Sequence, residues 1–522
     1  MLGKSEFPKE MGEARWGRPL LLHSLSRNHP CEAVCSHSPG EPAQFAGCGI
    51  SVKDGQESER ITNRRLKRLR LAAGSLPPRW RGALGAVLST SYPESVRFLY
   101  ALGNEFKTFK FGLARIRTLL DALGRPQEAC RFVHVAGTNG KGSTCAFIER
   151  VLRQAGFRTG LYVSPHLVEP TERVRICGQP VTPEEFTAAF EIVHSTAERL
   201  IASGCIDMHP TYFETMTAMA FHLFRERATG IVVLETGMGG RLDATNIVTP
   251  LVSVITPIDF DHEKYLGTTI PEIAYEKAGI LKPGCPAVFS RQRLEALEVL
   301  ERRAVETGSP VTHATDWQAR DLRIHAFGSK FLATNGAAQF PVDCPLIGEH
   351  QVDNALTAIA SLSVLAALDE GFTRITPETI HNGIASTRWP GRLELVRTAP
   401  GVFLDGAHNP AGARALAAYI RRFHAEKRIW MLFGAMRDKD IHMMGPELFP
   451  LAHELVFTTP NQARAFHAEE IREISGEARA HIINSPAEAL QFVLKAPPED
   501  VVFITGSLYL VGEIRAELGL VG

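Results

Sequence analysis

A glycine-rich loop with one lysine follows a short apolar run, and it limits what this chain can fold into more than any other segment. The run covers residues 132–136 and is typical of a buried strand; the loop, residues 137–143, reads Gly-Thr-Asn-Gly-Lys-Gly-Ser. Apolar residues then recur at helical spacing, at Ile148, Val151, Leu152 and Ala155. A loop that opens a helix offers backbone N–H groups to phosphates. The segment therefore predicts a nucleotide site.

The loop is one residue away from the standard Gly-x4-Gly-Lys-Ser/Thr pattern. The alternative is a tight turn between strand and helix that binds nothing. We favour the phosphate-binding loop because strand, lysine and helix all agree with it. Lys141 would then reach the β/γ-phosphates, and Ser143 would add a hydroxyl near Mg²⁺.

Length and composition describe an ordinary globular protein of two to three domains. Of the 522 residues, 44% are hydrophobic and 22% are charged, and no apolar run approaches a membrane span. The 57 basic and 57 acidic side chains balance, so there is no electrostatic case for a nucleic-acid partner. We expect a monomer with neither nucleic acid nor membrane as a partner.

The first 90 residues differ from the rest. They carry 14 basic and 8 acidic side chains, include a basic run at 60–70 and lack sustained periodicity, which favours a solvated or disordered extension. They also lack a signal-peptide core. The nine cysteines of the chain form no Cys-x-x-Cys pair, which is typical of a reducing, cytoplasmic setting. Zinc binding by Cys31, Cys35 and Cys48 with His37 is an alternative, but its spacing matches no common module.

From residue 91 onward, strands and helices alternate, which predicts a doubly wound α/β fold with a mostly parallel sheet. The expected strands are 132–136, 161–163, 231–234, 251–255 and 287–289, then 402–404, 429–433, 455–457 and 501–504. We expect helices at 351–368 and 411–423 and a small antiparallel piece within 316–347. A boundary near 386–390 would divide an ATP-binding domain, 91–387, from a smaller α/β domain, 388–522.

Polar residues stand directly after several of these strands. Ser164 follows the second strand, Glu235 the third, and Asp259 and His262 the fourth. Ligands on parallel sheets bind beyond the carboxyl ends of the strands, so these side chains should converge beside the loop. A hydroxyl, a carboxylate and an imidazole there predict a magnesium site formed by Ser164, Glu235 and His262.

Ten motifs occur in one order along residues 91–522. They are the loop 137–143, Ser164-Pro-His-Leu167, Glu172-Arg173, Phe213-Glu214, Glu235-Thr-Gly-Met-Gly-Gly-Arg-Leu-Asp-Ala-Thr-Asn246, Asp261-His262, Glu276-Lys-Ala-Gly-Ile280, Pro390-Gly-Arg-Leu-Glu394, Asp405-Gly-Ala-His-Asn409 and Asp438-Lys-Asp440. This set resembles the folylpolyglutamate synthase and dihydrofolate synthase branch of the Mur ligases. The resemblance implies a P-loop central domain and a Rossmann-like C-terminal domain.

The resemblance also implies an activity. A substrate carboxylate would take the γ-phosphoryl group of ATP, and the amino group of L-glutamate would attack the acyl phosphate. The implied catalytic residues are Lys141, Lys277 and His408. The implied nucleotide contacts are Thr138, Asn139, Gly140, Lys141, Gly142, Ser143, Asn354, Arg392 and Asp405. Two Mg²⁺ ions would take part, one of them served by a carbamylated Lys277. Without the resemblance, we would place Lys277 on a solvated face, paired with Glu276 or Glu272.

Two further segments resemble the dihydropteroate pocket of bacterial bifunctional enzymes. The implied residues are Thr211, Tyr212, Phe213, Glu214, Leu242, Asp243 and Ala244. Phe213 would stack on the pterin and Asp243 would accept hydrogen bonds from its N–H groups. The alternatives are a core aromatic for Phe213 and a helix cap for Asp243. Lys110 departs from the pattern, because some bifunctional relatives carry an acidic residue there.

The expected function is glutamate addition to dihydropteroate and then to reduced folates. The nearest alternatives are a folylpolyglutamate synthase without the first activity and a Mur-type ligase for another carboxylate. A nucleotide-dependent switch is a different class, and the polar groups of a second α/β domain, Asp405 and His408, argue against it.

Overall fold

An eight-stranded, mostly parallel sheet carries the glycine-rich loop in the computed structural model, which describes residues 90–103 and 112–520. Its strand order is β4-β3-β2-β5-β1-β6-β7-β8, and all neighbouring strands are parallel except the pairs β2–β3 and β3–β4 at one edge, which are antiparallel. The strands are β1 (Arg131–Ala136), β2 (Thr159–Tyr162), β3 (Val174–Ile176), β4 (Gln179–Pro180), β5 (Ile231–Glu235), β6 (Val252–Ile255), β7 (Ala287–Phe289) and β8 (Val311–His313). The predicted N-terminal extension, its cysteines and Lys110 lie outside the described residues.

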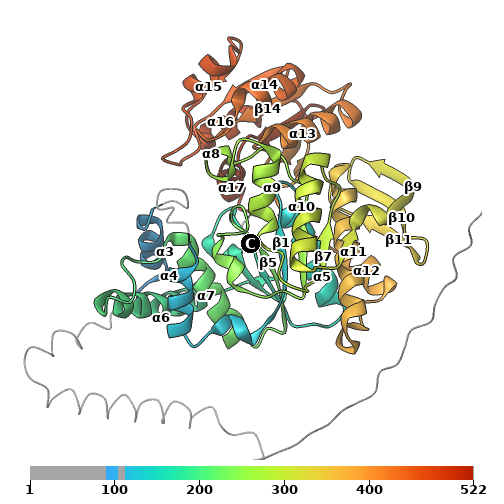
Figure 1. Ribbon diagram of the computed structural model, residues 1–522. Helices are drawn as coiled ribbons and strands as arrows, with labels where there is room; N and C mark the ends of the chain where they lie inside the picture. The colour runs from blue at the N-terminus through green and yellow to red at the C-terminus, as the bar shows by residue number, and fades with distance from the viewer. Residues whose placement is uncertain (1–89, 104–111, 521–522) are drawn as a thin grey trace, which may run out of the picture. The chain divides into compact units, whose positions relative to one another are not determined.

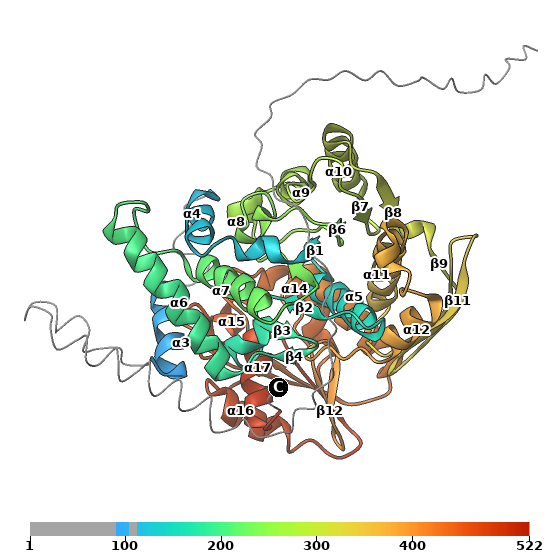
Figure 2. The same cartoon turned by 90° about the horizontal axis from the view of Figure 1, so that it is seen from below.

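Helices cover both faces of this sheet, because successive side chains of a buried strand point to opposite sides. On β1, Val133 and Val135 face the core that α5 shares with α11 and α12, while Phe132 meets Phe221 of α7 edge to face, with ring centroids 5.6 Å apart. Figures 1 and 2 both show α6 and α7 on one side and α11 and α12 on the other. The helices of this part are α3 (Tyr92–Ala101), α4 (Ala114–Ala122), α5 (Lys141–Gln154), α6 (Pro183–Ala202), α7 (Tyr212–Glu226), α8 (Glu263–Leu266), α9 (Ile270–Ala278), α10 (Leu294–Thr307), α11 (His350–Leu368) and α12 (Pro377–Ala385).

Helix α11 is long and apolar enough to cross a membrane, and no other described helix passes that test. Judged by length and composition alone, this helix contradicts the prediction that no apolar run approaches a membrane span. Two-thirds of the helix is nevertheless buried, in a core shared with α5 and the small antiparallel sheet. Its apolar surface is thus already covered by protein, as in an ordinary core helix.

Two more sheets complete the described chain. The small antiparallel sheet consists of β9 (Gln318–His325), β10 (Gly328–Thr334) and β11 (Gln339–Cys344). The other has the order β12-β13-β17-β14-β15-β16 and is parallel except for β12. It comprises β12 (Glu394–Thr398), β13 (Gly401–Leu404), β14 (Ile429–Phe433), β15 (Glu454–Phe457), β16 (His481–Ile482) and β17 (Val501–Thr505), with helices α13 (Pro410–Phe423), α14 (Ile441–Leu448), α15 (Ala468–Ser475), α16 (Pro486–Val493) and α17 (Leu508–Glu517). The expected α/β architecture is confirmed, and the predicted boundary at 386–390 falls between α12 and β12.

Candidate active site

The glycine-rich loop joins β1 to α5, which begins at Lys141. Gly140 caps the helix with a φ of +82°, and a Cβ built there would lie 2.2 Å from Asn354 Oδ1. At Gly137, with a φ of +154°, a Cβ would lie 1.8 Å from Thr256 Oγ1. Both positions require glycine. The loop is therefore pressed between α11 and the end of β6.

Two lysines meet at this loop. Lys141 Nζ donates to the carbonyl oxygens of Gly137 and Thr138, at 3.1 and 3.2 Å, and Lys277 Nζ donates to the Gly137 carbonyl at 2.8 Å. Lys277, on α9, is 4% exposed. Burial, with the charge of Lys141 adding to it, lowers the pKa of Lys277 to about 7. A neutral amine is thus accessible near physiological pH.

The alternative position of Lys277, on a solvated face beside Glu276 or Glu272, is wrong. Glu276 pairs with Arg241 at 2.8 Å. Glu272 caps its own helix by accepting bonds from Thr269. Helix α9 turns Lys277 inward instead, next to the apolar Ile273 and Ala274.

The three predicted magnesium ligands lie in one cleft. Glu235 ends β5, and its Oε2 accepts a hydrogen bond from the Ser164 backbone N–H at 3.2 Å. Burial raises the pKa of Glu235, although the charge of Lys141 opposes this. His262 precedes α8 with a φ of +53°, a left-handed conformation that non-glycine residues adopt mostly where surrounding structure imposes it.

The cleft has a volume of about 510 Å³ and is lined by segments next to the eight-stranded sheet and next to the C-terminal sheet. It contains every predicted nucleotide, metal and catalytic residue: Thr138, Asn139, Gly140, Lys141, Gly142, Ser143, Ser164, Glu235, His262, Lys277, Asn354, Arg392, Asp405 and His408. The first and last of these residues, Thr138 and His408, are 270 positions apart in the sequence. The structure thus brings these residues together, whereas the role of each one stays a prediction.

The C-terminal sheet contributes through the loop after β13. Asp405 accepts bonds from the N–H groups of Leu393 and Ala407, at 2.9 and 3.0 Å, which fixes the loop. His408 Nδ1 donates to the Gly406 carbonyl at 2.7 Å, so Nε2 faces Asp261, 3.7 Å away. Asn409 Nδ2 donates to Asn139 Oδ1 at 2.9 Å. This last bond ties the C-terminal sheet to the glycine-rich loop.

Sequence reasoning missed the Asp261–Lys439 ion pair. Lys439 Nζ lies 2.7 Å from Asp261 Oδ1, and their side chains are 9% and 10% exposed. Burial alone would raise the pKa of Asp261, but the neighbouring His408 and His262 and the charge of Lys439 hold it well below its usual value. The motifs Asp261-His262 and Asp438-Lys-Asp440 contained both residues, yet nothing in either motif shows that they meet.

A second cleft, of about 760 Å³, adjoins the first. The two share Asp259, Asp261, His262, Arg293, His408, Asn409 and Ala411. The second cleft adds Arg414, Arg437, Lys439 and Arg464. Several of these cations have acidic partners, such as Arg414 with Asp259 at 3.5 Å and Arg437 with Glu470 at 2.6 Å. Six lysine and arginine side chains line this cleft against five aspartate and glutamate side chains, so the cations outnumber the acids by only one.

None of the predicted dihydropteroate residues lines the main cleft. Thr211 caps α7. Glu214 accepts a hydrogen bond from Thr211 N–H and forms an ion pair with Arg115 at 2.9 Å. Asp243 caps a short turn, which is the alternative to pterin binding given above for this residue. Its Oδ1 accepts a hydrogen bond from Thr245 N–H at 3.0 Å, and its Oδ2 accepts one from Met238 N–H at 2.9 Å. A direct bond from Asp243 to a pterin gains no support from these contacts.

Phe213 reaches closer to the cleft. Its ring, half-buried, packs so tightly on Gly237 that a Cβ there would lie 2.5 Å from it. Gly237, Met238 and Gly239 line the main cleft. Phe213 therefore backs one wall of the cleft, with Asp243 holding Met238 in the same wall.

Two family models match the chain. The Mur ligase middle domain matches residues 135–362, and the glutamate ligase domain of Mur ligases matches residues 391–508. The dihydrofolate synthase/folylpolyglutamate synthase of Bacillus subtilis is 38% identical over 422 residues, which span 78% of this chain and 95% of that protein. This chain is a Mur ligase of the dihydrofolate synthase/folylpolyglutamate synthase family. It is an ATP-dependent glutamate ligase.

Solved structures of relatives agree with the ligase fold. A folylpolyglutamate synthase from Mycobacterium tuberculosis, complexed with ADP and AMPPCP, superposes with a TM-score of 0.74 at 32% identity, over 82% of this ligase and 99% of that chain. The Escherichia coli protein in complex with DHPP and ADP gives a TM-score of 0.71 at 31% identity, over 81% and 97%.

Proposed function

We propose that this ligase adds L-glutamate to dihydropteroate and then to reduced folates, each time through an acyl phosphate. The observation that carries the proposal is the convergence of the glycine-rich loop, Glu235, His262, Lys277 and the loop after β13 on one cleft. The carboxylate oxygen attacks the γ-phosphorus and ADP leaves. The glutamate nitrogen then attacks the acyl carbon, loses a proton and expels phosphate.

We assign the nucleotide site to the N-terminus of α5. Backbone N–H groups there and the Lys141 ammonium would hold the triphosphate, where they stabilise charge that grows during phosphoryl transfer. Asn354, Arg392 and Asp405 line the same cleft from α11 and the C-terminal segment. The related Mycobacterium tuberculosis folylpolyglutamate synthase was solved in complex with ADP and AMPPCP, which supports a nucleotide at this position.

Ser164, Glu235 and His262 fit a magnesium ion. They offer a hydroxyl, a carboxylate and an imidazole to one cleft, and Glu235 is a buried carboxylate. When bound, magnesium would neutralise negative charge on the phosphate oxygens. The protein's part is to hold these donors rigidly, through the bond between Ser164 N–H and Glu235.

Lys277 is proposed to carry a carbamate. Its neutral amine attacks CO2, a C–N bond forms and one proton leaves to solvent. The anion would stand near Gly137 and suit a second Mg²⁺. The supporting observations are the burial of Lys277 and its bond of 2.8 Å to the Gly137 carbonyl.

The substrates are assigned to opposite ends of the cleft. The pterin would lie along the wall of Gly237 to Gly239, beside Phe213. Glutamate would enter from the second cleft, where the half-exposed Arg414 suits its carboxylates. The relatives include both bifunctional enzymes and a Lacticaseibacillus casei folylpolyglutamate synthase, 35% identical over 99% of that protein. Loss of the first activity is therefore the alternative.

Purified ligase should release ADP only when ATP, glutamate and a pteroate or folate are all present. ADP release from ATP and Mg²⁺ alone would reject the ligase in favour of a nucleotide switch. We also place the protein in the cytoplasm as a monomer; all six cysteines in the described part of the chain are free thiols, which agrees with a reducing setting.

A further inference from the structure

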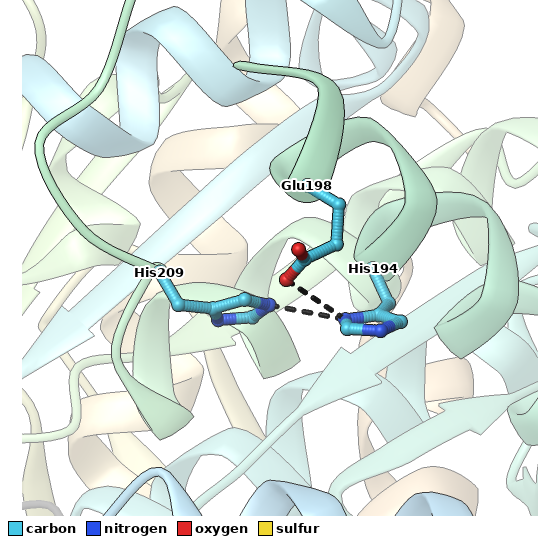
Figure 3. Close-up of side chains that lie close together, drawn as sticks. All are labelled: His194, Glu198 and His209. Atoms are coloured by element: carbon cyan, nitrogen blue, oxygen red, sulfur yellow. Dashed lines mark hydrogen bonds and ion pairs between the residues drawn. The ribbon is translucent and has the colours of Figure 1, made fainter. Parts of the chain in front are cut away.

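His194, Glu198 and His209 form a cluster away from the cleft, and their ligand atoms all lie within 4.8 Å of one another. Figure 3 shows the three side chains pointing toward a common point. His194 and Glu198 are one turn apart on α6, whereas His209 belongs to the segment that leads into α7. No other described group of three such residues is as close together. We propose that this cluster, the His194 cluster, binds a divalent transition metal ion such as Zn²⁺.

The hydrogen bonds around His209 prepare it as a ligand. His209 Nδ1 lies 2.9 Å from the Pro210 carbonyl oxygen, which can only accept, so the ring carries its proton on Nδ1. Nε2 then presents a lone pair toward His194 Nδ1, 3.2 Å away. A backbone carbonyl that fixes the tautomer of a histidine ligand is a usual feature of metal sites.

The distances suit a tetrahedral ion. Two ligands bound to Zn²⁺ at about 2.1 Å lie about 3.4 Å apart. The distance of 3.2 Å between His194 Nδ1 and His209 Nε2 is close to this value. Glu198 Oε1 lies 4.0 Å from His194 Nδ1, so its side chain needs a small movement. Glu198 is free to make it, because its side chain is 55% exposed. The fourth position would be taken by water.

Aromatic rings hold the two imidazoles in place. Phe98 contacts both, with ring centroids 4.4 Å from His194 and 5.3 Å from His209, and Phe190 stacks on His194 at 5.2 Å. Packing thus reduces the freedom lost when an ion binds. A bound ion would join α6 to the start of α7, whose first turn contains Thr211 to Glu214. The site would therefore stabilise a segment that backs the substrate wall.

The test is Zn²⁺ titration of the full-length protein by calorimetry. His209→Phe keeps a ring against Phe98 but removes both nitrogens, and Glu198→Gln changes only an exposed charge. His313→Ala is the matched control, since His313 pairs with Glu301 at 3.0 Å without a second imidazole. We expect His209→Phe to lose one equivalent of Zn²⁺, Glu198→Gln to bind it at least about tenfold more weakly and the control to match wild type.

Hydrogen exchange gives a second readout. Zn²⁺ should slow amide exchange in residues 203–212 of the wild type and of His313→Ala, but not of His209→Phe. Equal Zn²⁺ stoichiometry and affinity in the wild type, His209→Phe and Glu198→Gln would overturn the proposal. So would loss of the same ion in His313→Ala. If His209→Phe fails to fold, Glu198→Gln alone decides between these results.

Discussion

Lys439 Nζ lies 2.7 Å from Asp261 Oδ1, so an ion pair joins the loop after β14 to the loop after β6. Asp261 precedes His262, and His408 also approaches it. The pair thus connects the C-terminal sheet to the proposed metal ligand. A mostly buried carboxylate that loses its partner is costly, about 3–5 kcal/mol.

Lys439→Met should therefore lower kcat/KM at least about tenfold, because Asp261 would be left unpaired beside the site. Steady-state kinetics and thermal unfolding measure the effect. Arg428→Met is the matched control: Arg428 pairs with Glu454 on the surface, where such pairs contribute about 0–1 kcal/mol. Similar kinetic losses in both variants would remove any special role from the buried pair.

Lys141→Ala should abolish turnover and leave the fold intact. The ammonium contacts only loop carbonyls, so its removal costs little stability, whereas a charge contact to transferring phosphate is worth about 3 kcal/mol or more. Lys330→Ala, which removes an exposed partner of Asp343, is the control. Retention of more than about a tenth of wild-type kcat would refute the phosphate role.

Much of this architecture was predictable from the sequence. The strands at 287–289 and 429–433 match β7 and β14 residue for residue, because continuous apolar runs mark buried parallel strands. The cleft residues were predictable since parallel strands end at one edge. Asp261–Lys439 was not, because 178 positions separate the two residues and only the docking of two sheets brings them together.

The role of Asp243 was also beyond the sequence. A carboxylate before Ala244-Thr-Asn246 fits a ligand contact and a cap equally well, and only the positions of Met238 and Thr245 reveal the cap. Lys277 was different: it follows Ile270, Ile273 and Ala274 on the apolar stripe of α9, so helix periodicity places it inward, and only its bond to the Gly137 carbonyl needed the structure.

Asp243→Ala should lower the stability of the protein by about 1–2 kcal/mol, the cost of a lost cap. Both activities should fall together, because Asp243 holds Met238 in a wall that either substrate would contact. Melting temperature and kcat/KM with dihydropteroate and tetrahydrofolate test this. A loss confined to dihydropteroate, at unchanged melting temperature, would instead point to a direct bond with the pterin.

Stability should depend on pH through Lys277. The folded pKa of about 7 lies below the usual 10.5, so between these values the unfolded chain binds more protons and stability rises with pH. In CO2-depleted buffer, the free energy of unfolding of the wild type should therefore rise by a few kcal/mol, relative to that of Lys277→Met, between about pH 7 and 10. A difference between the two proteins that does not change with pH would contradict the buried, neutral amine.

Arg414→Ala should raise the KM for glutamate about tenfold and leave the KM for ATP unchanged, because Arg414 lines only the second cleft. Arg397→Ala, at an exposed position on β12, is the control. An equal rise in both KM values would place glutamate elsewhere.

Mass spectrometry of the products tests the central claim most directly. Purified ligase receives ATP, Mg²⁺ and glutamate with dihydropteroate alone, and separately with tetrahydrofolate. We predict a dihydropteroate product heavier by one glutamate residue and a tetrahydrofolate series extended by further glutamates. Glutamate addition to tetrahydrofolate without any addition to dihydropteroate would contradict the dual activity.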